Sequence, residues 1–304
     1  MAPVAVAVLL AALALVGGGC GKAKVGSSAT AATGLQVVAA ENFWGSIAAQ
    51  IGGSRVHVTS VITSPATDPH DYEPTAADAR TIAGARLVIV NGIGYDPWAP
   101  KLIAANPVSG RVVLDVGDLT GIKPGGNPHR WYSPTDVQLV IGAIARDYAK
   151  LEPKDAGYFA QQKARLETQA LAQYKQLIAS IREKYHGVPV GASESIFAPL
   201  AQALGLKLLT PYSFLKAISE GTEPTAADKT TIDRQIAGRL IKLWVYNSQN
   251  STPDVKRITD AARKRGIAIT TITETLVPSS ATFEDWQSRQ LQALQAALAN
   301  ATGR

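Results

Sequence analysis

The stretch AGYFAQQKARLETQALAQYKQLIASIREK, from Ala156 to Lys184, stands between two regions in which strand and helix patterns alternate. It contains no proline, and no glycine after Gly157. Its apolar residues recur at helical spacing, and the stripe consists of Leu166, Ala170, Tyr174, Leu177 and Ile181. At about 1.5 Å per residue, a helix of about 28 residues is ~42 Å long, more than is usual in a globular protein. We therefore expect one long helix that joins two lobes.

Short apolar runs alternate with helical patterns on both sides of this stretch. The predicted strands are residues 35–40, 56–62, 86–92, 111–117, 188–193, 206–213, 241–247 and 267–273. The predicted helices are residues 41–53, 75–85, 196–205, 225–238, 252–266 and 283–301. Such alternation indicates mainly parallel sheets with helices on their faces. The expected fold is α/β, with two (β/α) lobes at residues 35–155 and 186–304, joined by one long rigid helix at residues 156–185.

The first twenty residues are typical of a secretory signal peptide. An apolar run from Val4 to Val16 is too short for a membrane span of roughly 20 residues. The one cysteine, Cys20, falls where a bacterial lipoprotein is cleaved and lipidated. No Lys or Arg precedes the run, and glycines replace the usual lipobox residues, so a plain signal peptide with an incidental cysteine is the alternative. We expect residues 21–34 to form a flexible tether, and the protein to be lipid-anchored on the outer face of the cytoplasmic membrane or periplasmic.

The composition excludes several classes of protein. A chain of 304 residues with 46% hydrophobic and 18% charged residues is globular. Its net charge of +6 comes from dispersed Lys and Arg residues, without a basic stripe interleaved with aromatics, so we expect no nucleic-acid partner. The sequence contains no P-loop, and any ATPase must be a separate chain. We expect the protein to be a monomer.

Two of the four histidines are candidates for metal ligands. His70, in SPATDPHDYEPT, and His129, in GGNPHRWYSPTDV, both follow a proline in a loop after a predicted strand. Ligand sites gather at the carboxyl ends of strands in parallel α/β sheets. His57 alternates with valines along a strand, and His186 ends the long helix, where a histidine interacts favourably with the helix C-terminus. We expect no ligand role for these two.

The segments DPHDYEPTAADARTIAGARLVIVNGIGYDPW and NPHRWYSP resemble those of the metal-binding solute-binding proteins (cluster 9, zinc–manganese type) of bacterial ABC transporters. The resemblance continues through ESIFAPLAQALGL, SEGTEPTAADKTTIDRQI and TETLVPSSATFEDWQSRQLQAL. It implies two lobes joined by a rigid helix, with His70 and His129 as the ligands from the first lobe. It also implies Glu194 as the third ligand and Glu274 as the fourth, with Asp285 as the alternative for the fourth. The alternative for Glu194 is an acid that favours a helix N-terminus.

Two neutral imidazoles and two carboxylates carry a formal charge of −2, which balances a divalent cation. Nitrogen and oxygen donors suit Zn²⁺ or Mn²⁺, with Fe²⁺ third, and argue against Cu⁺. The resemblance implies that the protein captures this ion in the cleft between the lobes and delivers it to an ABC permease with a separate ATPase. Because the imidazoles must be neutral to bind, we expect the affinity to fall as the pH drops through the range of histidine.

Two other functions stay open at this point. A secreted metallohydrolase also uses His and Glu ligands, but it needs an open coordination position and a general base, and the sequence contains no HExxH motif. A receptor for a small organic solute, or an adhesin, could share the fold. We expect a receptor and not an enzyme.

Overall fold

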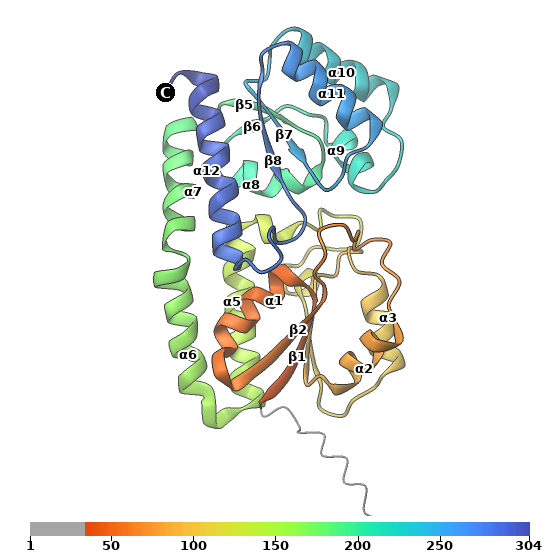
Figure 1. Cartoon of the computed structure of the whole chain (residues 1–304), viewed down its shortest axis with the longest axis vertical. Helices are drawn as coiled ribbons and strands as arrows, with labels where there is room; N and C mark the ends of the chain where they lie inside the picture. Colours follow the sequence, from red (N-terminus) through yellow and green to blue (C-terminus); the bar gives the residue numbers. More distant parts are fainter. Residues whose placement is uncertain (1–33) are drawn as a thin grey trace, which may run out of the picture. The chain divides into compact units, whose positions relative to one another are not determined.

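The computed structural model describes residues 34–304 (Figure 1). The predicted signal peptide, Cys20 and all but the last residue of the predicted tether lie outside the described residues. Within residues 34–304, every helix is too short or too polar to cross a membrane.

The N-terminal lobe is built on a sheet of four parallel strands. They are β1 (Leu35–Glu41), β2 (Val56–Ile62), β3 (Leu87–Val90) and β4 (Val112–Asp115), in the order β2-β1-β3-β4. Its helices are α1 (Asn42–Gly52), α2 (Ala76–Gly84), α3 (Trp98–Ala105), α4 (Val116–Thr120) and α5 (Pro134–Leu151). All four residues of β3 are buried, as expected for a central parallel strand covered on both faces.

The C-terminal lobe repeats this topology with a second parallel sheet. Its strands are β5 (Pro189–Ala192), β6 (Lys207–Leu208), β7 (Leu243–Asn247) and β8 (Ala268–Ile272), in the order β6-β5-β7-β8. Its helices are α8 (Ala198–Ala203), α9 (Tyr212–Ser219), α10 (Ala226–Ala237), α11 (Pro253–Lys264) and α12 (Phe283–Thr302). The predicted α/β fold with two mainly parallel sheets is confirmed.

The linking segment differs in one respect from the predicted uninterrupted helix. It consists of α6 (Ala156–Arg165), a π-helical turn (Leu166–Ala170) and α7 (Ala172–Tyr185). In the π turn, the amide of Leu171 donates to the carbonyl of Leu166 at 2.9 Å, one residue further back than in an α-helix. Both leucines are buried in the core, together with Tyr174. The extra residue in the turn therefore brings Leu171, which lies off the predicted stripe, onto the buried face.

Helix α12 joins the lobes a second time. It packs along α7 and also contacts α1 (Figure 1). The amide of Phe283 donates to the hydroxyl of Ser46 at 2.9 Å, and Gln50 donates to Glu284 at 2.9 Å. One hydrophobic core runs through both lobes. The predicted lobe limits at residues 155 and 186 stay predictions.

Several elements depart from the sequence pattern. The predicted strand 206–213 contains only the two residues of β6, and α9 begins directly after Pro211. Helices α3, α4, α5 and α9 were not predicted, although Ser133 caps α5 by accepting from the amide of Asp136, and Pro134 takes its first position. The remaining strands and helices lie within a few residues of their predicted limits.

Candidate functional site

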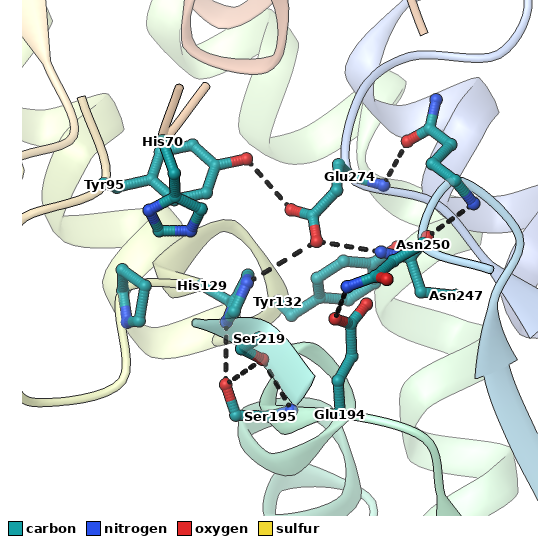
Figure 2. A network of polar contacts seen from close by, with 12 residues as sticks. His70, Tyr95, His129, Tyr132, Glu194, Ser195, Ser219, Asn247, Asn250 and Glu274 are labelled. Carbon is teal, nitrogen blue, oxygen red and sulfur yellow. Dashed lines mark hydrogen bonds and ion pairs between the residues drawn. The ribbon is translucent and has the colours of Figure 1, made fainter. Parts of the chain in front are cut away.

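Four loops bring the predicted ligands together at the facing edges of the two sheets (Figure 2). His70 lies in the loop between β2 and α2, and His129 lies in the segment between α4 and α5. Glu194 follows β5 after one serine, and Glu274 follows β8 after one threonine. Each lobe thus supplies two of the four residues from the carboxyl ends of its strands, where binding sites form in parallel α/β sheets.

His129 is fully buried, and its tautomer is fixed by its neighbours. Its Nδ1 lies 2.8 Å from Oδ1 of Asn127, which also accepts the backbone N–H of His129 at 3.1 Å. Because this oxygen is an acceptor, Nδ1 carries the proton and Nε2 presents a lone pair. Burial lowers the pKa of His129 to about 4, so the ring is neutral.

The free nitrogen of His129 faces a carboxylate. Its Nε2 is buried and lies 3.6 Å from Oε1 of Glu274, and within the described part of the chain it has no hydrogen-bond partner. A lone pair and a carboxylate oxygen at this distance repel each other, so the contact is no ion pair in the neutral state. A cation between the two atoms would satisfy both.

Glu194 is almost completely buried. Its Oε2 accepts a hydrogen bond from Nδ2 of Asn250 at 2.9 Å, whereas Oε1 is a buried acceptor without a partner among the described residues. Burial, together with the charge of Glu274, raises the pKa of Glu194 to about 8. The side chain is therefore protonated at neutral pH unless a positive charge arrives beside it.

Glu274 is held from both lobes. Its Oε2 accepts from the hydroxyl of Tyr95 at 2.9 Å, and its Oε1 accepts from Nδ2 of Asn247 at 2.9 Å. Its side chain is 16% exposed. Burial raises its pKa to about 7, although the hydrogen bond from Tyr95 opposes the shift. Two carboxyl groups with raised pKa values, one buried and one half-buried, thus lie near the neutral imidazole of His129.

His70 is half-buried and stands at the other side of the site. Its ring meets that of Tyr95 edge to face, with centroids 4.8 Å apart. Its backbone N–H donates to Oδ1 of Asp68 at 2.9 Å, which fixes the loop after Pro69.

A cavity of about 260 Å³ lies between three of the four predicted ligands. Its lining includes His70, Glu194, Glu274 and Asn250, and His129 lies buried beside Glu274. Asp285, the alternative fourth ligand, is exposed in the first turn of α12 and does not line the cavity. Within the part of the chain that the structure describes, no three His, Cys, Asp or Glu side chains are already grouped closely enough to hold a metal ion. The donors thus surround one space without yet converging on a point.

Four neighbours of the predicted ligands were not identified from the sequence. They are Tyr95, Asn127, Asn247 and Asn250, which hydrogen-bond to the side chains of His129, Glu194 and Glu274. Tyr95 stands directly before Asp96 in the loop that follows β3, and this loop, like those of His70, Glu194 and Glu274, leaves the carboxyl end of a strand. The place of Tyr95 after a predicted strand is the sequence feature that could have pointed to its position near the site.

Residues 37–297 match the family described as "zinc-uptake complex component A periplasmic". Among curated proteins, the chain is similar to "manganese-binding lipoprotein MntA" of Halalkalibacterium halodurans, with 28% identity over 149 residues, or 47% of this chain and 48% of that protein. It is 26% identical over 251 residues to "metal ABC transporter substrate-binding lipoprotein FimA" of Streptococcus parasanguinis, covering 75% and 77% of the two chains. It is also 30% identical over 176 residues to "iron-binding protein YfeA" of Yersinia pestis, covering 53% and 54%. The chain spans about half the length of two of these relatives, MntA and YfeA.

Two solved structures share the fold. The manganese-bound "periplasmic metal binding protein" of Candidatus Liberibacter asiaticus superposes with a TM-score of 0.72 at 21% identity, covering 86% of this chain and 98% of that one. The "periplasmic zinc binding protein TroA" of Treponema pallidum gives a TM-score of 0.71 at 20% identity, covering 87% and 99%.

Proposed function

The chain belongs to the zinc-uptake complex component A family of periplasmic proteins, and on that premise we propose that it captures a divalent transition metal and delivers it to an ABC permease. The ion would bind between the lobes, with His70 and His129 as ligands from one lobe and Glu194 and Glu274 from the other. The permease and its ATPase would be separate chains.

The main support for this proposal is a pair of buried hydrogen-bond acceptors that have no partner among the described residues. Nε2 of His129 and Oε1 of Glu194 are buried and have no hydrogen-bond partner among residues 34–304. Leaving a buried polar atom unpaired costs about 1–3 kcal/mol, and a metal ion would remove this cost at both atoms. A buried imidazole lone pair beside two carboxyl groups is a donor set for a cation and not for an anion.

The donor types define the class of ion. Two imidazole nitrogens and two carboxylates suit Zn²⁺, Mn²⁺ or Fe²⁺ and disfavour Cu⁺, which prefers sulfur. The names of the similar proteins mention manganese, iron and zinc. Two ionised glutamates would neutralise the charge of the divalent ion inside the buried site.

We propose that the protein works outside the cytoplasmic membrane and is not an enzyme. Similar proteins are named lipoproteins, which supports Cys20 as the lipid-bearing residue. Mass spectrometry of the protein from membranes should find a diacylglyceryl group on Cys20, and Cys20→Ala should release the protein. The receptor should be a monomer in size-exclusion chromatography with light scattering. The metal-loaded protein should turn over no peptide, ester or phosphate substrate.

Calorimetric titration of the metal-free protein with Zn²⁺ and with Mn²⁺ tests the central proposal. His129→Ala should weaken binding of both ions by at least about a hundredfold, because it removes a buried donor that no other side chain replaces. His57→Ala is the matched control, since His57 is exposed on β2 and should leave both affinities unchanged. Equal binding by the wild type and His129→Ala would reject this site. A protein that holds no transition metal after loading would support the small-solute receptor instead.

A further inference from the structure

A hydrogen bond crosses between the lobes beside Glu194. Nδ2 of Asn127, two residues before His129, donates to the backbone carbonyl of Ser195 at 2.7 Å. The orientation of this amide is unambiguous, because its Oδ1 accepts the backbone N–H of His129 and its Nδ2 faces a carbonyl. Ser195 directly follows Glu194, and its own amide donates to the hydroxyl of Ser219 at 3.1 Å. Asn127 therefore ties the N-terminal lobe to a fixed piece of backbone beside Glu194.

A second hydrogen bond crosses between the lobes beside Glu274. The hydroxyl of Tyr132, three residues after His129, lies 2.9 Å from the backbone carbonyl of Thr273. It lies equally close to Oε1 of Gln290, which itself accepts the backbone N–H of Thr273 at 2.9 Å. Tyr132 is fully buried, so water does not compete for its hydroxyl. Since Thr273 directly precedes Glu274, Tyr132 ties the lobes beside the second glutamate.

The two bonds share one pattern. Both donors belong to residues 127–132, the segment that also carries His129. Both acceptors are backbone carbonyls next to a proposed ligand of the other lobe. A bond to the backbone fixes the course of the chain, and with it the point from which the neighbouring side chain reaches into the site. A metal site needs its donors held within roughly 0.5 Å of their productive positions, and these two bonds hold both glutamate loops relative to His129.

We propose that Asn127 and Tyr132 are positioning residues that set the metal affinity, Asn127 through Glu194 and Tyr132 through Glu274. This inference rests on the proposed function, and neither residue is itself a ligand. Replacing residues that orient metal ligands typically weakens binding by about 10–100-fold. Tyr132→Phe should therefore weaken Zn²⁺ binding by about tenfold. Asn127→Ala should weaken it by more, because Asn127 also accepts from Nδ1 of His129.

Double-mutant cycles test which glutamate each residue positions. A residue that acts through one ligand has nothing left to position once that ligand is removed, so the two substitutions are not additive. Tyr132→Phe should weaken Zn²⁺ binding by about tenfold in the Glu194→Ala background, but by less than about threefold in Glu274→Ala. Asn127→Ala should show the opposite order, with its smaller loss in Glu194→Ala. Competitive titration against a chelator of known affinity measures these constants.

Tyr148→Phe is the matched control. The hydroxyl of Tyr148 is also fully buried and also donates to a backbone carbonyl, that of Ala48 at 3.0 Å, but this bond lies within the N-terminal lobe. Neither residue lines the cavity between the proposed ligands. Tyr148→Phe should lower the stability towards urea, as Tyr132→Phe does, and leave the Zn²⁺ affinity unchanged. An equal loss of affinity in the two variants would overturn the inference.

The two glutamate backgrounds separate positioning from a general loss of structure. A general loss would weaken binding equally in Glu194→Ala and Glu274→Ala, and that result would overturn the inference while the proposed function stands. If Asn127→Ala does not fold, the cycle with Tyr132→Phe decides alone. If the wild type binds no transition metal, the proposed function itself fails.

Discussion

Nε2 of His129 and Oε1 of Glu274 lie 3.6 Å apart, one on each lobe. The imidazole is neutral because burial lowers its pKa to about 4, so the two atoms meet as a lone pair and an acceptor. Nδ1 of His129 is bound to Asn127, which also donates to the carbonyl of Ser195 in the other lobe at 2.7 Å. The ring is therefore held in the tautomer that a metal ion requires.

Substituting two acidic residues, Glu274 and Asp285, tests which of them is the fourth ligand. Glu274→Gln should weaken Zn²⁺ binding by at least about tenfold, because a neutral amide oxygen is a poorer donor for a cation. Asp285→Asn should leave the affinity unchanged, since Asp285 is exposed on α12 and away from the cavity. Calorimetry of both variants measures this, and a loss of affinity in Asp285→Asn would instead favour the alternative ligand.

Metal binding should release protons near neutral pH. In the metal-free protein, burial raises the pKa of Glu194 to about 8 and that of Glu274 to about 7, and both groups must be ionised to bind. The affinity for Zn²⁺ should therefore fall as the pH drops from about 8 to about 6, and up to two protons should leave at pH 6. Calorimetry in buffers of different ionisation enthalpy counts these protons. Binding without proton release at pH 6 would contradict the raised pKa values.

This pH dependence adds a cause to the one expected from the sequence. The sequence pointed to protonation of the histidines, but burial lowers the pKa of His129 to about 4, so this ring is already neutral above about pH 5. The carboxyl groups of Glu194 and Glu274, with pKa values raised to about 8 and about 7, also titrate in the relevant range.

The stability of the metal-free protein should depend on Glu194. Because its pKa is higher in the folded state, the folded protein binds more protons than the unfolded chain between about pH 4.5 and pH 8. The associated stability is present below about pH 4.5 and is lost as the pH rises through about 8. Glu194→Gln should remove this loss and, at pH 9, raise the free energy of unfolding by up to about 5 kcal/mol, since one pKa unit corresponds to about 1.4 kcal/mol. Urea unfolding at pH 5 and pH 9 measures the effect, and parallel pH profiles of the two proteins would disprove it.

The π turn predicts which leucine of the linking segment contributes more to the stability of the protein. Leu171→Ala should destabilise the protein by about 2–5 kcal/mol, because the side chain is fully buried. Leu177→Ala, in a half-buried position on the predicted stripe, should cost no more than about 1–2 kcal/mol. Chemical unfolding compares the two variants. A larger loss of stability in Leu177→Ala than in Leu171→Ala would indicate an uninterrupted α-helix, as the sequence pattern alone suggested.

Much of the fold could be predicted from local pattern. The run that became β3 is apolar, and that of β2 mixes valine and isoleucine with polar residues; the alternation of such runs with helices indicates a parallel sheet. The π turn could not be predicted in this way, because LETQA contains neither proline nor glycine. It arises from tertiary packing of Leu166 and Leu171 against the core, which overrides the local helical period.

The sequence drew attention to the four proposed ligands but not to the residues that hold them. The proline-histidine pairs and the family resemblance pointed to His70, His129, Glu194 and Glu274; in the structure His70, Glu194 and Glu274 line one cavity, and His129 lies buried beside Glu274. Their role as metal ligands stays a prediction. Neither a proline-histidine pair nor the family resemblance drew attention to Tyr95 or Asn250. Their hydrogen bonds join segments that are distant in the sequence, so they are visible only once the chain is folded.

The most direct measurement is a crystal structure of the Zn²⁺-loaded protein with anomalous data collected on both sides of the zinc absorption edge. We predict one strong zinc peak between the lobes, within about 2.0–2.2 Å of one nitrogen each from His70 and His129 and one oxygen each from Glu194 and Glu274. A peak bound by other residues, or zinc absent from this cavity in crystals of loaded protein, would contradict the proposed site.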